Sequence, residues 1–492
     1  MYILTALSGD PLEDLRTSTA PNKQQLIEAR TALLHLDVPP YLRYFIWIAG
    51  VGKCFIGQCD LGVTVQNQPV TVLLAQAAGS TLQLVTIASV IAIILGLVVG
   101  ITTALRQYSG YDYGVTFLSF LFFSLPIFWV AVLLKQFVAI GFNDFLSDPQ
   151  IAPWIIPILA VISGLIWMSI LPGKGRRKLI TFAAAALASA AVIIYMDLSD
   201  WFSYPHIGIV GVALTLVGAA FGVTTISTGL KNRLALYASL VVAGIGVAAW
   251  YPFIYFTTGL PFWGWIGIGV ATVLVALAVG WFMGGDDRRP VARTAAIVGF
   301  VAFSVLSLDR FMQVWDDYAN SGRIKGRPIA TIGSGTPGLE GSLWVHGVDL
   351  FTHLLLPTLA LILISFATYT RYSRASLLEV MNQDYIRTAR AKGLTERTVV
   401  VRHAFRNALI PIATIVAFDI GGIIGGAVIT ERVFGWTGMG ALFQNGLDHV
   451  DPNPVLIPSC FNQYSALRRI TYGVADQVAQ HPGQHHIVSA HK

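Results

Sequence analysis

Charged residues are scarce in this chain of 492 residues. Asp, Glu, Lys and Arg together make up 12% of it, whereas 55% is hydrophobic. Soluble domains carry about twice that share of charge, so the composition excludes an ordinary soluble protein. Several apolar runs reach roughly 18 residues or more, which is long enough for a helix to cross a bilayer. The sequence therefore predicts an all-α polytopic membrane protein.

Cysteine is rare as well. Cys54, Cys59 and Cys460 are too few and too badly spaced for a zinc or iron–sulfur site. Cys54 and Cys59 could form a disulfide on an oxidising side of the membrane, and two unpaired thiols fit the spacing equally well. The His-rich stretch at 480–486 could bind metal, but a disordered tail is the favoured interpretation. We therefore predict no metal site.

Two kinds of catalytic signature are also missing. The chain has no G-x-x-x-x-G-K-[ST] phosphate loop, and the nearest piece, residues 173–175, lacks the upstream glycine and the following hydroxyl. No cluster of His, Asp, Glu or Ser has a catalytic arrangement. The basic balance of the chain is not a nucleic-acid signal, because its positive charge lies between apolar runs. We expect no catalytic residue, no bound cofactor and no nucleic-acid partner.

About ten apolar segments are expected to be transmembrane helices. Their expected bounds are 81–105, 113–140, 150–171, 179–196, 205–226, 234–256, 262–284, 294–311, 351–370 and 410–430. Residues 1–80 contain no apolar run long enough to span and no cleavable signal peptide of the usual form.

The loops between these segments alternate in charge. The loops near 141–149, 197–204 and 257–261 have no Lys or Arg. The other loops carry Arg106; Lys174, Arg176, Arg177 and Lys178; Lys231 and Arg233; Arg288, Arg289 and Arg293; and Arg371 and Arg374. By the positive-inside rule these basic loops are cytoplasmic. The alternation places residues 384–411 in the cytoplasm and residues 1–80 outside.

Residues 384–411 carry six basic and two acidic residues between two apolar runs. The pattern predicts two short amphipathic helices that are separated at Gly393, where glycine allows a sharp turn and a close backbone approach. Thr395 is expected to cap the second helix, and Pro411 to stand at the start of the next membrane helix. Val401, Phe405 and Leu409 recur every four residues and are expected to pack on the bundle. From composition alone, a helix pair on anionic lipid headgroups is the favoured interpretation.

Six short motifs occur in order along the chain and together resemble one family. They are SGDPLEDL (8–15), CDLGVTV (59–65), SLPIFWVAVLL (124–134), HLLLPTLALIL (353–363), RYSRASLLEVMNQDYIRTARAKG (371–393) and GGIIGGAVITERVFGWTGMG (421–440). The chain resembles ABC-importer inner-membrane permeases of the dipeptide/oligopeptide/nickel subfamily. Ala389, Ala391 and Gly393 fall on the small-residue and glycine positions of that family's cytoplasmic loop, while its leading acidic residue is absent.

This resemblance implies a permease subunit that imports di- or oligopeptides across a bacterial plasma membrane. The expected partners are two ABC ATPase subunits that hold ATP-Mg, a second permease subunit, an extracytoplasmic substrate-binding protein and membrane lipid. Docking of an ATPase then becomes the favoured interpretation of the basic loop. The resemblance implies that the ATPase-coupling residues are Asp384, Tyr385, Arg387, Thr388, Ala389, Arg390, Ala391, Lys392, Gly393 and Leu394.

Four intramembrane positions are candidates for the translocation path: Pro126, Asp419, Gly422 and Gly426. A charge such as Asp419 inside a span is costly and often functional, although an interhelical hydrogen bond or a protonated carboxyl explains it more simply. Glycines at 421, 422, 425 and 426 have small-xxx-small spacing, which favours helix packing first and a gate second. Pro126 is expected to kink its helix. Lys135, Asp309 and Arg310 are expected to reach the membrane interface.

The resemblance covers residues 1–140 and 350–455, and implies an importer-type permease core interrupted by a six-helix insertion. The expected parts are an extracytoplasmic segment (1–80), two core parts (81–140 and 350–455, with a coupling loop at 371–409), an accessory transmembrane bundle (145–345) and an atypical polar tail (456–492). An even number of inserted helices keeps the following core on its side of the membrane. The family's first and last helices are not recognisable, so we hypothesise a permease truncated at both ends.

The main alternative is an ion- or proton-coupled secondary transporter of small solutes. Such carriers usually show inverted repeats and several charged or unwound sites at the bilayer midplane. We find no convincing internal repeat, and Asp419 is the single deep charge. Dependence of uptake on an ATPase or on the proton gradient separates the two classes.

Overall fold

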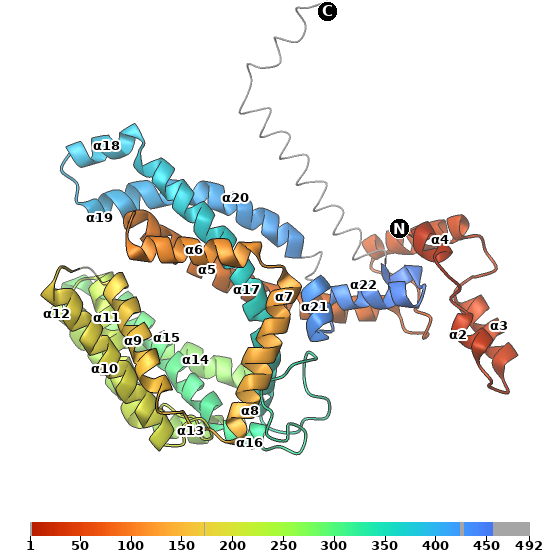
Figure 1. Cartoon of the computed structure of the whole chain (residues 1–492), viewed down its shortest axis with the longest axis horizontal. Helices are drawn as coiled ribbons and strands as arrows, with labels where there is room; N and C mark the ends of the chain where they lie inside the picture. Colours follow the sequence, from red (N-terminus) through yellow and green to blue (C-terminus); the bar gives the residue numbers. More distant parts are fainter. Residues whose placement is uncertain (1, 172, 424–427, 456–492) are drawn as a thin grey trace, which may run out of the picture. The chain divides into compact units, whose positions relative to one another are not determined.

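The computed structural model describes residues 2–171, 173–423 and 428–455, and most of these residues are helical while none lies in a β-strand (Figure 1). Eight of the described helices are long and apolar enough to cross a membrane, or nine if one bent pair counts as a span. The expected class, an all-α polytopic membrane protein, is confirmed.

Several of the ten expected spans differ from the helices of the structure, and two of them differ in length or continuity as follows. α9 (Ile155–Ile170) has 16 residues and is therefore about 24 Å long, shorter than a typical hydrocarbon core of about 30 Å. The segment expected at 113–140 is broken: α6 (Gly110–Ser124) ends before Pro126, and the spanning stretch is Ile127–Ser147. Pro126 is the N-cap of α7 (Ile127–Leu133), so it separates two helices and does not kink one.

The chain forms two compact units. Unit 1 comprises Met1–Val138, Thr331–Ser334 and Leu354–Lys492, and unit 2 comprises Ala139–Ala330 and Gly335–His353. Unit 2 holds most of the segment expected to be an inserted bundle. The interpretation of the two units as permease core and insertion stays a prediction.

Unit 2 is a bundle of antiparallel helices, shown in yellow and green in Figure 1. Its core combines small and branched residues, such as Ala238, Val242 and Ala295, with the fully buried ring of Trp344. Its helices are α8 (Gly141–Ser147), α9, α10 (Arg176–Leu198), α11 (Gly208–Ser227), α12 (Arg233–Ala248), α13 (Trp250–Thr257), α14 (Phe262–Met283), η3 (Gly285–Asp287), α15 (Arg288–Gln313) and α16 (Trp315–Ala319). α12 and α13 form the bent pair, with an angle of 49° between them.

The Asp309 side chain is buried in unit 2, and its expected position at the membrane interface stays a prediction. Its carboxylate accepts hydrogen bonds from the backbone N–H of Ile207 (2.6 Å), the indole of Trp250 (2.7 Å) and the amide of Gln313 (2.7 Å). A buried carboxylate is tolerated when donors surround it. Asp309 therefore joins three parts of this bundle.

Unit 1 holds most of the motifs that carry the resemblance. Its helices are α1 (Tyr2–Leu7), α2 (Glu13–Thr17), α3 (Lys23–Leu33), α4 (Pro40–Lys53), η1 (Cys54–Ile56), α5 (Val70–Leu105), α6, α7, α18 (Asp384–Ala391), α19 (Glu396–Thr398), η4 (Val399–Ala404), α20 (Phe405–Ile423), α21 (Val428–Phe434) and α22 (Met439–Asp448). The π-helical η2 (Leu134–Ile140) and the long α17 (Leu343–Met381) run through both units. α5 begins eleven residues before the bound expected for the first span, at Val70 rather than 81.

α5 packs on α17 through glycine. Gly96 and Gly100 face Tyr369, Thr370 and Ser373, and a Cβ atom at Gly100 would overlap the Ser373 Oγ. That Oγ donates a hydrogen bond to the Gly96 carbonyl oxygen at 2.9 Å. Small residues thus let the backbones of α5 and α17 approach closely. The helix packing expected for the glycines at 421, 422, 425 and 426 stays a prediction.

Two further side chains settle earlier alternatives. Cys54 and Cys59 are joined in a disulfide. The Lys135 Nζ donates to the carbonyl oxygen of Val433 at 3.1 Å and lies 5.9 Å from the ring centre of Phe434. Lys135 thus binds the end of α21.

Candidate functional site

The loop predicted to be cytoplasmic is a helix–turn–helix at one end of unit 1. α17 ends at Met381 and is followed by the short α18. After a turn, the chain returns through α19, η4 and α20 as one continuous helical stretch (Figure 1). The two amphipathic helices expected from the sequence are therefore present. Pro411 lies inside α20 rather than at the start of a new helix, because the second loop helix and the membrane helix are continuous.

α18 has one buried face and one exposed face. Ile386 is fully buried and Ala389 is 6% exposed; both belong to a core cluster with Leu377 of α17 and Ala104 of α5. Val399, Ala404 and Ala408 complete the cluster from the returning helix. α18 is thus seated on three other helical segments of unit 1.

Nine of the ten residues expected to couple to an ATPase are exposed, six on α18 and three in the turn that follows it. They are Asp384, Tyr385, Arg387, Thr388, Arg390, Ala391, Lys392, Gly393 and Leu394, whereas Ala389 faces the core. The Tyr385 hydroxyl also accepts a hydrogen bond from Asn407 of α20 at 3.0 Å. The structure therefore brings these residues together on one surface.

The turn after α18 depends on Gly393. Its φ is +76°, in the left-handed region that glycine adopts without strain. Space around its α-carbon is open, so within the described chain the expected close backbone approach is absent. Within the described chain, glycine is thus required here for its backbone conformation.

An ion pair closes the same turn. The Arg390 guanidinium donates to both carboxylate oxygens of Glu396, at 2.7 and 3.2 Å. This hydrogen bond lowers the pKa of Glu396 and raises the pKa of Arg390. Thr395 caps the second helix as expected, since its hydroxyl accepts from the backbone N–H of Thr398 at 3.4 Å. A paired carboxylate and a cap fix the geometry of the turn.

The packing face of the second helix differs from the expected one. Val401 is 57% exposed, whereas Val400, Ala404, Ala408 and Ile412 are buried at four-residue spacing. The first turns, Val399–Ala404, are π-helical, and a π-turn holds more residues than an α-turn. The buried face is therefore one position earlier than the expected face.

Two arginines of α17 bind α6 beside this loop. In the sequence they were counted only as basic residues that mark the cytoplasmic side. Arg374 forms an ion pair with the buried carboxylate of Asp112 at 2.9 Å. Arg371 lies over the rings of Phe120 and Phe123, 5.1 and 4.6 Å from their centres. The helix that leads into α18 is therefore attached to α6 at successive turns.

Three of the four residues expected to line a translocation path lie in the part of the chain that the structure describes. Asp419 lies in α20 and accepts a hydrogen bond from the Tyr369 hydroxyl of α17 at 2.5 Å, which is the simpler interpretation named above. Pro126 lies at the break between α6 and α7. Gly422 is in the last turns of α20, and Gly426 lies outside the described residues. A role of these residues in transport stays a prediction.

Glu431 is a further polar centre that the sequence analysis missed. Its fully buried carboxylate accepts from the Thr81 hydroxyl of α5 (2.7 Å) and from the backbone N–H of Gly440 (2.6 Å) and Ala441 (3.2 Å). Burial raises its pKa. Glu431 thereby holds α21 and the N-terminus of α22 against α5.

These elements define a multi-pass, all-α membrane protein with an exposed, firmly seated loop helix. The family model of the binding-protein-dependent transport system inner membrane component matches residues 296–461. The match begins inside α15, so it reaches further upstream than the bound of 350 expected for the second core part.

Known relatives agree with the predicted resemblance. The chain is 44% identical to the oligopeptide transport system permease protein OppB of Mycobacterium tuberculosis over 26% of this chain and 40% of the relative. It is 40% identical to a putative peptide permease protein of Brucella ovis over 32% and 50%. It is 37% identical to the dipeptide transport system permease protein DppB of Escherichia coli over 27% and 41%. The chain thus spans half or less of the length of these relatives, and the resemblance to inner-membrane permeases of peptide ABC transporters is confirmed for that part.

Proposed function

We propose that this chain is a permease subunit of an ATP-driven importer of di- or oligopeptides in a bacterial plasma membrane. The matched relatives are named as oligopeptide and dipeptide permeases, which supports the substrate class. The chain itself would be a transport subunit rather than an enzyme. ATP-Mg would be held by separate ATPase subunits, and a second permease subunit and an extracytoplasmic binding protein would complete the importer.

The observation that carries this proposal is the two-faced α18. A helix that passes force between proteins needs one face for its partner and one rigid attachment to its own chain. α18 has both: nine of the ten named loop residues are exposed, and Ile386 and Ala389 are buried among three other segments. A helix that merely joins two spans needs no such seat.

The attachment gives a route for movement. α17 enters α18 directly and is bound to α6 through Arg374 and Asp112. α6 ends next to Pro126, where α7 begins. A displacement of α18 by an ATPase would therefore be passed to α17, α6 and the break at Pro126. Pro126, Asp419, Gly422 and Gly426 are the positions that we propose to respond along the path.

A bulky substitution on the exposed face tests the docking role. Ala391 is exposed, so Ala391→Trp leaves the core of the loop intact while it obstructs a partner's surface. Loss of about 1.4 kcal/mol of binding free energy weakens an interaction tenfold. We expect Ala391→Trp to reduce both ATPase co-purification and ATP-dependent peptide uptake in proteoliposomes by at least about tenfold.

Asp286→Trp is the matched control, because Asp286 is exposed in another loop predicted on the same side of the membrane. It should leave uptake unchanged, and both variants should insert normally. Uptake that persists without any ATPase and stops when the proton gradient is dissipated would exclude the proposal and favour a secondary transporter.

A further inference from the structure

The N-terminal part of unit 1 contains a cavity that the proposed function does not use. It has a volume of about 450 Å³ and lies between α1, α2, α3, the start of α4 and residues 450–453. A second cavity of about 530 Å³ adjoins it, since Tyr2, Leu34, Arg43 and Asn453 line both. These volumes are in the range of small-ligand sites. The loop charges predict that this part of the chain lies on the extracytoplasmic side of the membrane.

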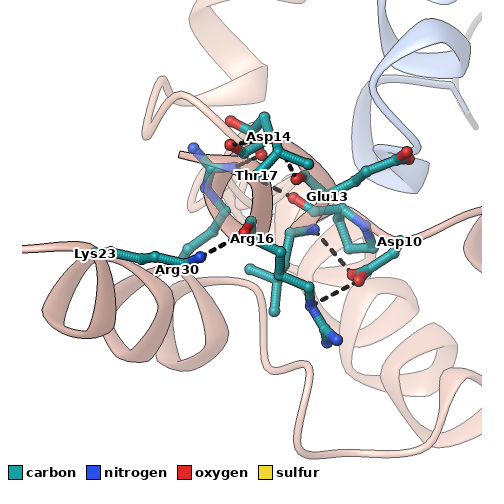
Figure 2. A network of polar contacts seen from close by, with 9 residues as sticks. Asp10, Glu13, Asp14, Arg16, Thr17, Lys23 and Arg30 are labelled. Carbon is teal, nitrogen blue, oxygen red and sulfur yellow. Dashed lines mark hydrogen bonds and ion pairs between the residues drawn. The ribbon is translucent and has the colours of Figure 1, made fainter. Parts of the chain in front are cut away.

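Most charges near the first cavity are already paired. Arg16 forms an ion pair with Asp10 at 2.9 Å, and Arg30 forms one with Asp14 at 2.6 Å. The Lys23 ammonium donates to the backbone carbonyl of Arg16 (Figure 2). This network joins α2 to α3 and to the preceding turn. Asp10 and Arg16, which line the cavity, are therefore paired with each other and not free for a ligand.

Two lining charges have no such partner. Arg43 and Asp37 make no ion pair and no side-chain hydrogen bond with any described residue, and the Nε of Arg43 is buried. The half-buried Arg43 side chain lines both cavities without a carboxylate partner, so its guanidinium favours an anion there. Asp37 is exposed and offers a carboxylate to the same cavity. Leu12, Ile27 and Leu34 supply apolar lining to this cavity.

We propose that this cavity binds a short free peptide, with its terminal carboxylate at Arg43 and its terminal ammonium at Asp37. Guanidinium and carboxylate groups form paired, charge-assisted hydrogen bonds, and an ammonium pairs with a carboxylate in the same way. The apolar lining contacts the side chains, and the adjoining cavity gives room beyond Arg43. The choice of a peptide rests on the proposed function; the opposite charges and the volume rest on the structure. The permease would thus hold substrate at its outer segment, apart from any path among the helices.

Binding of trialanine to the full chain in lipid nanodiscs tests this site by calorimetry. We expect saturable binding that is weakened about tenfold by Arg43→Gln and also weakened by Asp37→Asn, as expected for loss of one charge-assisted contact. Lys23→Gln and Glu28→Gln are the matched controls. They remove one positive and one negative charge from α3, and neither residue lines the cavity. Trialanine amide and N-acetyl-trialanine should bind more weakly than trialanine, because each lacks one terminal charge. Equal binding of the blocked peptides would instead indicate a site for an internal segment of a partner protein.

A second variant leaves every charge in place. Thr31→Trp fills the cavity from α3 and should also abolish trialanine binding while the unfolding temperature stays unchanged. Wild-type protein that fails to bind trialanine at millimolar concentration, or Arg43→Gln protein that binds as well as wild type, would overturn the site. If binding fails but Ala391 remains essential for ATP-dependent uptake, only the site is wrong. If trialanine binds but uptake needs no ATPase, only the proposed function is wrong.

Discussion

Gly393 shows how one residue can be required for its backbone alone. Its φ of +76° places it in the left-handed region, and its surroundings are open. Any side chain would fit in space, yet most would strain the turn between α18 and α19. The strain for an ordinary residue is about 1–2 kcal/mol, and asparagine suffers less than alanine.

We therefore predict that Gly393→Asn is tolerated better than Gly393→Ala, although asparagine is larger. Gly393→Ala should reduce ATP-dependent uptake several-fold because the turn changes the angle of α18. Uptake by reconstituted importers measures both variants. Equal loss in the two variants would show that the space around Gly393 is filled by a partner, and that backbone conformation is not the cause.

Asp451 ties two distant segments together and gives a pH dependence. Its buried carboxylate accepts from the backbone N–H of Val65 at 2.8 Å and from that of Asn453 at 3.2 Å. Burial raises the pKa of Asp451 to about 6, which outweighs these hydrogen bonds and nearby His449. The folded protein therefore binds this proton more tightly than the unfolded chain does.

The stabilisation from that proton is fully present below about pH 4 and is lost as pH rises through about 6. We predict that wild-type protein loses roughly 1–3 kcal/mol of stability between pH 4 and pH 7 that Asp451→Asn protein does not lose. Unfolding of both proteins in detergent across this range measures the difference. Parallel pH profiles would contradict the prediction.

Local residue patterns predicted the local contacts of the loop and missed the long-range ones. The Thr395 cap and the turn at Gly393 depend on neighbours in sequence, so their residue types were sufficient. The pairs Arg374–Asp112 and Glu431–Thr81 join residues 262 and 350 positions apart, and no spacing rule links them. In the sequence, Asp112 and Glu431 cannot be distinguished from ordinary loop charges, and only the structure shows that they are buried.

Among the helices, prolines and one irregular turn account for the displaced boundaries. Pro126 separates α6 from α7, whereas Pro411 is accommodated inside α20. Proline marks a position of reduced hydrogen bonding, but neighbouring helices decide whether the helix ends there. The π-helical turn at Val399–Ala404 likewise moved the buried face from Val401 to Val400. Such a turn has no reliable sequence signature.

The contact of α5 with α17 should be intolerant of side chains at one glycine of α5 and tolerant at another. A Cβ at Gly100 would overlap the Ser373 Oγ and lie 2.7 Å from the Thr370 carbonyl oxygen, whereas nothing lies within 4 Å of one at Gly79. We predict that Gly100→Leu destabilises the protein by about 1–3 kcal/mol, as overpacking usually does.

Gly79→Leu is the control in the same helix and should change stability by less than about 0.5 kcal/mol. Thermal unfolding of the two purified variants in detergent compares them directly. Similar loss in both would mean that the long α5 tolerates no leucine for reasons of helix geometry, and that its contact with α17 is not the cause.

For the entire chain, loop charge and helix length give different counts of membrane crossings. The basic loops after residues 105, 171, 226, 284 and 370 share one side if both of the expected segments between each loop and the next cross, as they do when all ten expected segments cross. By length and composition, eight or nine described helices qualify, and α9 falls short at about 24 Å. A short helix can still cross where the bilayer thins or flanking residues extend to the interface. α9 is followed by Lys174, Arg176, Arg177 and Lys178, whose charge strongly favours the cytoplasmic side.

We therefore predict that α9 crosses the membrane despite its length. In intact cells that express single-cysteine variants lacking the three native cysteines, Asp200→Cys should react with a membrane-impermeant maleimide and Lys174→Cys should not. Both positions lie in loops at the ends of α10, so they are on opposite sides of the membrane if α10 spans, and whether α9 spans decides which of the two is outside. If Lys174→Cys is labelled and Asp200→Cys is protected, α9 is re-entrant. The sides assigned to the loops of unit 2 by the positive-inside rule would then be reversed. One further crossing before α18 would be needed to keep α18 in the cytoplasm, where the proposed ATPase contact requires it.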